Sequence, residues 1–302
     1  MGFKEIQDQI RKKLSEKNAI LLAHYYQREE IQDIADFLGD SLALSIEAAR
    51  TEAEVIVFAG VHFMAESASI LSPEKTVLLP RMEAGCPLAD MITPSELETA
   101  RTEHPDSQVV TYINSSAAIK ALSDICCTSA NAVNVVNSIQ GDNILMIPDG
   151  NLARYTARFT KKVVIPWQGY CPVHHFLNKE DILTAKEHHP GAKLAVHPEC
   201  TTEVIDLADF VGSTAAIIRY AHDTDAGEFL IGTEKGILQP LRKENPNKTF
   251  ILASDKLVCE TMKLITLEDI LASLVEMKHA VKVPDEVREP AFKALDRMLK
   301  IR

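Results

Sequence analysis

Three of the six cysteines recur at similar intervals, and thiols placed in this way could share one metal centre. Cys86 and Cys171 are 85 residues apart, and Cys171 and Cys259 are 88 residues apart. Each follows an apolar run that predicts a short buried strand. Open α/β sheets bind ligands just past the carboxyl ends of their strands, so the thiols are expected where a ligand would lie. The runs are Thr76–Pro80, Lys162–Pro166 and Thr249–Ala253.

Three converging thiols suit a metal better than a disulfide, because their number is odd and a reducing cytosol keeps thiols free. Three alternatives remain open: unrelated buried thiols, zinc held by three cysteines and a fourth ligand, or an iron–sulfur cluster. None of the three lies in the CxxC pair that is usual for structural zinc, which favours a catalytic cluster. A cluster on three thiolates leaves one iron open, and open iron serves as a Lewis acid for a substrate oxygen.

Hydroxyl groups are predicted at equivalent places in the chain. Ser41, Ser129 and Thr214 are expected as N-caps of helices, and they precede the three cysteines by 45, 42 and 45 residues. Unpaired N–H groups at the start of a helix bind anions. Three such caps around one site therefore indicate a ligand with two or three anionic groups.

Further polar side chains come at the ends of the predicted strands, where they could donate, accept or move protons. Glu199 is the best candidate for a general base, because a dry site raises the pKa of a carboxyl group. These strand-end residues are His24, Tyr26, His62, Tyr112, Asn114, Asn151, His174, His197 and Glu199.

A βαβαβ unit that occurs three times positions these residues. The ends of the first strands, at His24, Tyr112 and His197, are 88 and 85 residues apart, close to the spacing of the cysteines. Alternating strands and helices predict parallel sheets with right-handed crossovers. In the first unit the expected strands are Ala19–Ala23, Val55–Ala59 and Thr76–Pro80, and the expected helices are Ile31–Phe37, Leu42–Thr51 and Phe63–Leu71.

The predicted fold is therefore α/β, with three similar αβα three-layer domains. Their parallel sheets are expected to be related by pseudo-three-fold symmetry around a central cleft. The domains are predicted at residues 1–104, 105–189 and 190–302. The first includes an N-terminal helix, and the third includes amphipathic C-terminal helices.

The composition is that of a globular protein, and it narrows the range of partners. The 302 residues carry a net charge of −11, which argues against nucleic acid or an anionic membrane as a partner. No apolar run approaches the roughly 18 residues of a membrane span. Residues 1–17 mix charged side chains at helical spacing and lack the apolar segment of a signal peptide. We therefore expect a cytoplasmic protein.

The motifs around these residues resemble those of the quinolinate synthase A family of NAD biosynthesis. They cover nearly the full length in the order of the family, so the match is specific. Departures are small, for Tyr25 stands where asparagine is common and Leu88 replaces a frequent methionine. The matching segments are Leu22–Gln27, Asp33–Ser41, Phe58–Glu66, Ala84–Met91, Thr111–Ser115, Cys127–Asn131, Ile147–Asn151, Trp167–His174, His197–Cys200, Gly212–Thr214, Ile231–Glu234 and Cys259–Lys263.

The resemblance implies three similar αβα domains and a [4Fe–4S] cluster. It also implies an activity that condenses iminoaspartate with dihydroxyacetone phosphate to quinolinate, phosphate and two waters. By the same resemblance, Cys86, Cys171 and Cys259 ligate the cluster and leave one iron open. The implied catalytic residues are Glu199, His197, Tyr26 and His24, and the implied substrate-binding residues are His24, Ser41, Tyr112, Asn114, Ser129, His197, Glu199 and Thr214.

The expected partners are the two small-molecule substrates, together with a transient contact to the enzyme that produces iminoaspartate. Two other classes of protein remain open. Another iron–sulfur hydro-lyase would share the open iron but should lack three anion-binding caps. A non-catalytic iron–sulfur sensor would need an effector surface such as a basic patch, and the sequence shows none.

Overall fold

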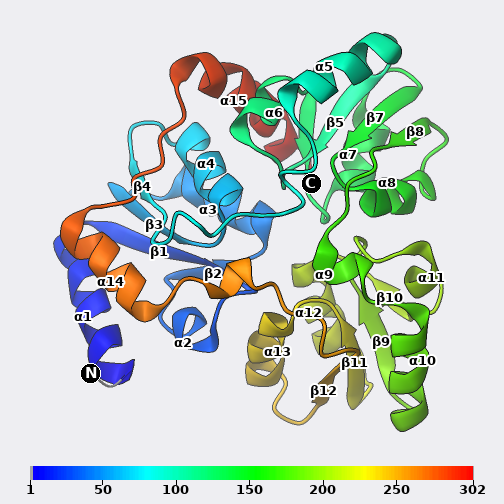
Figure 1. The fold of residues 1–302 in the computed structure, drawn as a ribbon. Coiled ribbons are helices and arrows are strands. Elements are labelled where there is room, and N and C mark those ends of the chain that lie inside the picture. The colour runs from blue at the N-terminus through cyan, green and yellow to red at the C-terminus, as the bar shows by residue number, and fades with distance from the viewer. Residues whose placement is uncertain (1–2, 302) are drawn as a thin grey trace.

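The computed structural model describes residues 3–301 and contains three parallel β-sheets of four strands each (Figure 1). The order of strands is the same in every sheet. The second strand along the chain lies at one edge, followed by the first, the third and the fourth. Parallel neighbours require a crossover after each strand, and helices supply these crossovers. The predicted α/β class with parallel sheets is confirmed.

The three sheets use successive parts of the chain. The first contains β1 (Ala19–His24), β2 (Phe37–Gly39), β3 (Val55–Ala59) and β4 (Thr76–Leu78). The second contains β5 (Gln108–Tyr112), β6 (Ile125–Cys127), β7 (Asn143–Ile147) and β8 (Val163–Pro166). The third contains β9 (Lys193–Val196), β10 (Phe210–Val211), β11 (Glu228–Gly232) and β12 (Thr249–Leu252).

Helices precede, connect and follow the strands. Those before and within the first sheet are α1 (Phe3–Glu16), α2 (Glu29–Gln32), α3 (Ser41–Arg50) and α4 (His62–Leu71). Around the second sheet are α5 (Pro94–Glu103), α6 (Ala117–Ala121), α7 (Ala132–Ser138), α8 (Gly150–Ala157) and α9 (Pro172–His175). Around the third are α10 (Lys179–His188), α11 (Thr202–Ile205), α12 (Thr214–Asp223), the 3₁₀ helix η1 (Lys235–Ile237) and α13 (Leu238–Glu244). The chain continues through η2 (Thr261–Lys263), α14 (Leu267–Glu276) and α15 (Asp285–Leu299).

The same aspartate contact holds the edge strand next to the first strand of each sheet, which is β2, β6 or β10. Asp36 directly precedes β2, and its Oδ2 accepts the Leu21 N–H at 2.8 Å while its own N–H donates to the Leu21 carbonyl at 2.9 Å. Such a reciprocal pair joins the edge strand to β1 before the ladder begins. The equivalent pairs are Asp124 with Val109, at 2.8 and 3.1 Å, and Asp209 with Leu194, at 2.9 and 2.9 Å.

Each sheet has one strand more than the predicted βαβαβ unit supplies. The additional strands β2, β6 and β10 have only three, three and two residues, too few to show a hydrophobic pattern. The prediction of a helix over 31–37 was wrong for this reason, because α2 ends at Gln32 and Phe37 pairs with β1. The strand predicted at 162–166 is confirmed as β8, but its predicted burial was wrong, since β8 is an edge strand whose Val163 is 57% exposed.

The first two sheets share one continuous hydrophobic core, and α14 and α15 also contribute to it. The third sheet lies between two cores of its own. After β12 the chain returns to the first two sheets, where α14 packs against α1 and α15 packs against α6, β6 and α4 (Figure 1). No helix within residues 3–301 combines the length and the apolar character that a bilayer crossing requires.

Candidate active site

One cavity is lined by every catalytic, substrate-binding and cluster residue that the resemblance implies, and loops of all three sheets contribute to its wall. Of the polar residues predicted at strand ends, His62 and Asn151 do not line it. His24 ends β1, Asn114 follows β5 and Glu199 follows β9, so each sheet sends polar side chains there from the end of its first strand. The predicted residues on the wall are His24, Tyr26, Ser41, Cys86, Tyr112, Asn114, Ser129, Cys171, His197, Glu199, Thr214 and Cys259. The wall also contains Asp40, Thr128, His174 and Thr261.

The six cysteines fall into two groups. Cys86, Cys171 and Cys259 follow β4, β8 and β12, are partly exposed and lie on the cavity wall. The other three are 0% exposed and pack in hydrophobic cores, so they are not on that wall. They are Cys126, Cys127 and Cys200.

Burial opposes ionisation of the three cavity thiols when no cation is near. It raises the pKa of Cys86 to about 12, and it also raises the pKa of Cys171 and of Cys259. A bound metal reverses this effect, because the thiolate is the form that ligates iron or zinc. Three such thiols on one wall therefore fit a cationic metal centre.

The three cavity thiols do not form a set whose sulfur atoms all lie within 4.8 Å of one another. Ligands of a tetrahedral zinc, at about 2.3 Å from the metal, lie roughly 4 Å from one another. Among the described residues, only Cys171, His174 and Glu199 bring three potential ligand atoms within 4.8 Å of one another. The three cavity thiols are not such a set, so a single zinc bound by all three would require them to move closer together.

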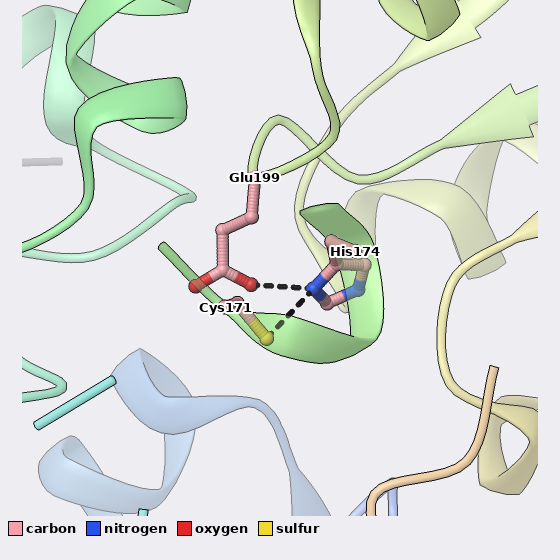
Figure 2. Close-up of side chains that lie close together, drawn as sticks. All are labelled: Cys171, His174 and Glu199. Atoms are coloured by element: carbon pink, nitrogen blue, oxygen red, sulfur yellow. Dashed lines mark hydrogen bonds and ion pairs between the residues drawn. The ribbon is translucent and has the colours of Figure 1, made fainter. Parts of the chain in front are cut away.

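Glu199 is a buried carboxyl group whose Oε2 contacts two histidines. His174 Nδ1 lies 2.8 Å from this oxygen and His197 Nδ1 lies 3.1 Å from it. Figure 2 shows that His174 Nδ1 also faces the Cys171 thiol, at 3.3 Å. The other carboxyl oxygen, Oε1, has no hydrogen-bond partner among the described residues. Buried oxygens normally accept a hydrogen bond, so Oε1 is the atom to which a ligand would donate one.

These contacts keep Glu199 ionised. Burial alone would raise the pKa of this carboxyl group, but His197 and His174 outweigh burial and hold the pKa below its usual range. The prediction that a dry site raises the pKa of Glu199 was therefore wrong, because it took no account of the two imidazoles. An ionised carboxylate is the form that accepts a proton from a substrate.

A chain of hydrogen bonds leads from Glu199 across the cavity to a tyrosine. His174 Nε2 lies 2.8 Å from Thr233 Oγ1, which lies 2.6 Å from the Tyr26 hydroxyl. The hydroxyl of Thr214 donates to the same phenol oxygen at 2.9 Å. Sequence analysis includes His174 among the polar residues at strand ends but does not single out Thr233, although both lie within matching motifs, at 167–174 and 231–234.

The other imidazole and phenol groups of the cavity are neutral. Burial lowers the pKa of His24 to about 3, and Lys263 and His197 add to this effect. His24 Nδ1 accepts the Tyr26 N–H at 3.1 Å, which leaves Nε2 as the donor. Burial raises the pKa of Tyr26 and of Tyr112 well above the usual value, so both phenols keep their protons. All three side chains are therefore uncharged hydrogen-bond donors.

Comparison with known proteins extends over almost the whole chain. A family model described as quinolinate synthetase A protein matches residues 8–300. The chain belongs to the quinolinate synthase family. It is 59% identical to a quinolinate synthase of Geotalea uraniireducens over 98% of each chain. It is 56% identical to quinolinate synthase 1 of Methanosarcina acetivorans, over 95% of this chain and 94% of that relative. It is 54% identical to a quinolinate synthase of Dehalococcoides mccartyi, over 95% of each chain.

In this member of the quinolinate synthase family, the three predicted hydroxyls line the cavity but do not cap helices, so that part of the prediction was wrong. Ser41 and Thr214 are the first residues of α3 and α12. The caps are the residues just before them, Asp40 and Ser213, whose side chains accept N–H groups from the first turn at 3.0 and 3.3 Å. Aspartate and serine are among the preferred N-cap residues, and each stands one residue before the predicted hydroxyl.

Ser129 was also predicted wrongly as a cap, because α7 begins three residues later and Asn131 occupies its N-cap position. The Ser129 hydroxyl lies 3.2 Å from His197 Nε2 instead. The three hydroxyls therefore contribute polar groups to the cavity wall, while other residues begin the helices.

Proposed function

We propose that this member of the quinolinate synthase family condenses iminoaspartate with dihydroxyacetone phosphate, giving quinolinate, phosphate and two waters. The observation that carries the proposal is one cavity wall that combines three thiols with the Glu199–His174 pair. Identity of 59% to a quinolinate synthase over 98% of each chain supports the same reaction.

In this proposal Cys86, Cys171 and Cys259 hold a [4Fe–4S] cluster. Their partial exposure on one wall, one thiol after the fourth strand of each sheet, supports a cluster as the bound group. When bound, a cluster on three thiolates supplies an open iron that acts as a Lewis acid on a substrate oxygen.

The three units are proposed to be related by pseudo-three-fold symmetry, with the cavity as their central cleft. The equal strand order of the sheets and the three equivalent aspartate contacts support this arrangement. The proposed domains, residues 1–104, 105–189 and 190–302, contain one sheet each.

Substrate binding is assigned to neutral donors on the cavity wall. Ser41, Ser129 and Thr214 are proposed to hold the phosphate and carboxylate groups, since hydroxyls donate to anions without requiring a Lys or Arg. Tyr112 and Asn114 are proposed to orient the triose. Tyr112 keeps its phenol proton, and Asn114 Oδ1 is buried without a hydrogen-bond partner among the described residues.

Proton transfer is assigned to Glu199 as the general base. Its Oε1 is free to receive a proton from the substrate, and its Oε2 is fixed by the two imidazoles. The hydrogen bonds through His174 and Thr233 then offer a path to the Tyr26 hydroxyl. His197 and His24 are proposed as donors to oxygens of the substrate.

The cellular setting follows from the same chemistry. Six free thiols suit the reducing cytoplasm, where we place the reaction. Iminoaspartate must come from an enzyme that oxidises the amine of an amino acid, and we propose a transient contact with that enzyme.

An anaerobic assay of the purified protein with iminoaspartate and dihydroxyacetone phosphate tests the proposal. We expect quinolinate and phosphate to appear together in equal amounts, with neither formed when one substrate is omitted. Dehydration of an unrelated hydroxy acid, with no quinolinate, would indicate another hydro-lyase. A protein with iron but no turnover, whose binding to a partner follows its redox state, would indicate a sensor.

A further inference from the structure

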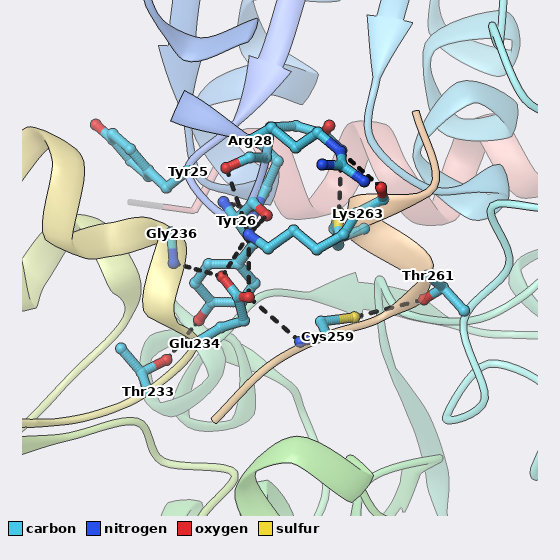
Figure 3. Close-up of polar contacts among 12 residues, drawn as sticks. Tyr25, Tyr26, Arg28, Thr233, Glu234, Gly236, Cys259, Thr261 and Lys263 are labelled. Atoms are coloured by element: carbon cyan, nitrogen blue, oxygen red, sulfur yellow. Dashed lines mark hydrogen bonds and ion pairs between the residues drawn. The ribbon is translucent and has the colours of Figure 1, made fainter. Parts of the chain in front are cut away.

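A buried ion pair beside the cavity has no part in the chemistry described so far. Glu234 follows β11 and its side chain is 0% exposed, while Lys263 ends η2 with its side chain 12% exposed. Lys263 Nζ lies 3.0 and 3.2 Å from the two carboxyl oxygens of Glu234 (Figure 3). Both residues lie in motifs of the quinolinate synthase resemblance, at 231–234 and 259–263.

The carboxylate of Glu234 fixes the backbone of a cavity cysteine. Its Oε1 accepts the Cys259 N–H at 3.2 Å, and its Oε2 accepts the Gly236 N–H at 2.7 Å. Holding the amide of Cys259 restricts the direction of its side chain, which contacts Thr261 Oγ1 at 3.4 Å. Because both oxygens accept backbone N–H groups as well as the ammonium, the carboxylate is held from several sides.

The second sheet fixes its own cysteine in a similar way. Asp149 follows β7, and its Oδ2 accepts the Cys171 N–H at 3.1 Å while its Oδ1 accepts the Leu152 N–H at 2.7 Å. In two of the sheets, therefore, an acidic residue after the third strand accepts the N–H of the cavity cysteine. Only the pair in the third sheet adds a lysine.

The lysine extends the arrangement to the first sheet. Its Nζ donates to the carbonyl of Tyr26, and to that of Gln27 at 3.4 Å. In return, Arg28 Nε donates to the Lys263 carbonyl at 2.8 Å (Figure 3). The segment held in this way carries the Tyr26 hydroxyl, which ends the hydrogen-bond chain from Glu199.

The two segments are packed closely against each other at Gly236. A Cβ atom placed on Gly236 would lie 2.6 Å from the Tyr25 carbonyl oxygen and 2.8 Å from the Tyr26 Cα. Gln32 Nε2 bridges the same place, donating to the carbonyls of Tyr25 and Gly236 at 2.9 and 3.0 Å. The loop after β11 and the loop after β1 therefore form one unit.

We propose that Glu234 and Lys263 are positioning residues that place the Cys259 thiol and the Tyr26 hydroxyl relative to each other. One ion pair then sets both a ligand of the metal centre and an end of the proton path. The inference rests on the proposed function for the roles of Cys259 and Tyr26. A buried ion pair by itself is weak evidence for stability, so geometry is the property to test.

The test uses Glu234→Gln, Lys263→Met and the double variant, as holoenzymes purified without oxygen. Lys256→Met is the matched control, because Lys256 lies in the segment between β12 and Cys259. Its side chain is 55% exposed and pairs with Asp181. The rate of iron release to an excess of a ferrous chelator is measured under native conditions. We expect either single variant to release iron about 10- to 100-fold faster, as partners of metal ligands do when lost.

The double variant separates positioning from folding. It buries no unpaired charge, so it should fold even if a single variant does not. Because the two residues act as a unit, its iron release should be no faster than that of the more affected single variant. A folded double variant that releases iron at the wild-type rate would overturn the proposal, as would equal acceleration in Lys256→Met.

A second readout does not require iron or turnover. In protein freed of metal, we expect the rate of alkylation at Cys259, relative to that at Cys171, to rise severalfold in the double variant, which removes both neighbouring charges together, and not in Lys256→Met. An unchanged ratio would contradict the inference. Failure of the proposed function looks different, since wild-type protein would then make no quinolinate while the ratio of alkylation rates still rose in the double variant.

Discussion

The sheets are nearly alike where their edge strands begin and unlike where their first strands end. Asp36, Asp124 and Asp209 make the same reciprocal contacts with the backbone of the neighbouring strand. The first strands, by contrast, lead to an imidazole, a phenol and another imidazole, which have different partners in the cavity. They are His24, Tyr112 and His197.

This difference separates the residues that build the fold from those that serve a reaction. A contact that recurs in every sheet has a structural role, because every sheet must pair a short edge strand with its neighbour. A side chain that differs from sheet to sheet suits an asymmetric ligand. Each sheet contributes a different part of the cavity wall, so each contacts a different part of that ligand. Substitutions at the two kinds of position should therefore affect different measurements.

The largest effect is expected at a cavity cysteine. Cys171→Ala should abolish the absorbance of the cluster and reduce turnover to background, because one of three proposed thiolates is lost. Iron content and the visible spectrum of anaerobically purified protein provide the measurement. Cys127→Ala is the control, since that thiol is fully buried in the core, and it should keep its iron. Full iron and activity in Cys171→Ala would contradict the assignment of the ligands.

A smaller effect is expected at the general base. Glu199→Gln should keep the cluster but lower kcat by about 10²- to 10⁴-fold, which is the usual contribution of a positioned base. The amide keeps the size of the side chain, so iron content should match that of wild type. Normal turnover in this variant would remove Glu199 from the mechanism and weaken the contrast between the two sets of residues.

The smallest effect on activity is expected at a repeated aspartate. Asp209→Ala leaves the Leu194 N–H without its acceptor and removes the partner of Lys193, so we expect a loss of about 1–3 kcal/mol in the free energy of unfolding. Urea denaturation measures this loss, and kcat of the folded variant should remain within a factor of two. A large fall in kcat without a loss of stability would break the comparison.

The same variant predicts a dependence on pH. Burial alone would raise the pKa of Asp209, but the Leu194 N–H and the Lys193 ammonium outweigh burial and lower it. A carboxyl group with a lowered pKa in the folded state stabilises the protein above its unfolded pKa of about 3.9 and loses this contribution as the pH falls. The part of the stability difference between wild type and Asp209→Ala that depends on charge should therefore shrink below about pH 4.

Most of the cavity could be predicted from the sequence because its residues recur with the spacing of the repeat. Long apolar runs such as 19–23 and 55–59 gave the central strands, and the polar residues after them could be read directly. The edge strands β2, β6 and β10 were not predicted, because two or three residues carry no periodic signal. Their one visible mark was an aspartate at the same place in each unit.

What the sequence could not supply was the set of contacts between units. The pKa of Glu199 depends on His174, which lies in α9 after the second sheet. The pairing of Glu234 with Lys263 joins two motifs that lie apart along the chain. The helix caps failed for a more local reason, because Asp40 and Ser213 were equally good caps one residue earlier.

The last helix has a consequence for the order of events during synthesis. α15 covers β6 and α6, Arg297 Nη1 donates to the Asp124 carbonyl at 2.7 Å, and Asn131 Nδ2 donates to the Ile301 carbonyl at 3.0 Å. A nascent chain that has already made the middle sheet still lacks this cover until α15 has left the ribosome. The apolar surface of the middle sheet that α15 covers therefore stays exposed while the third sheet is translated.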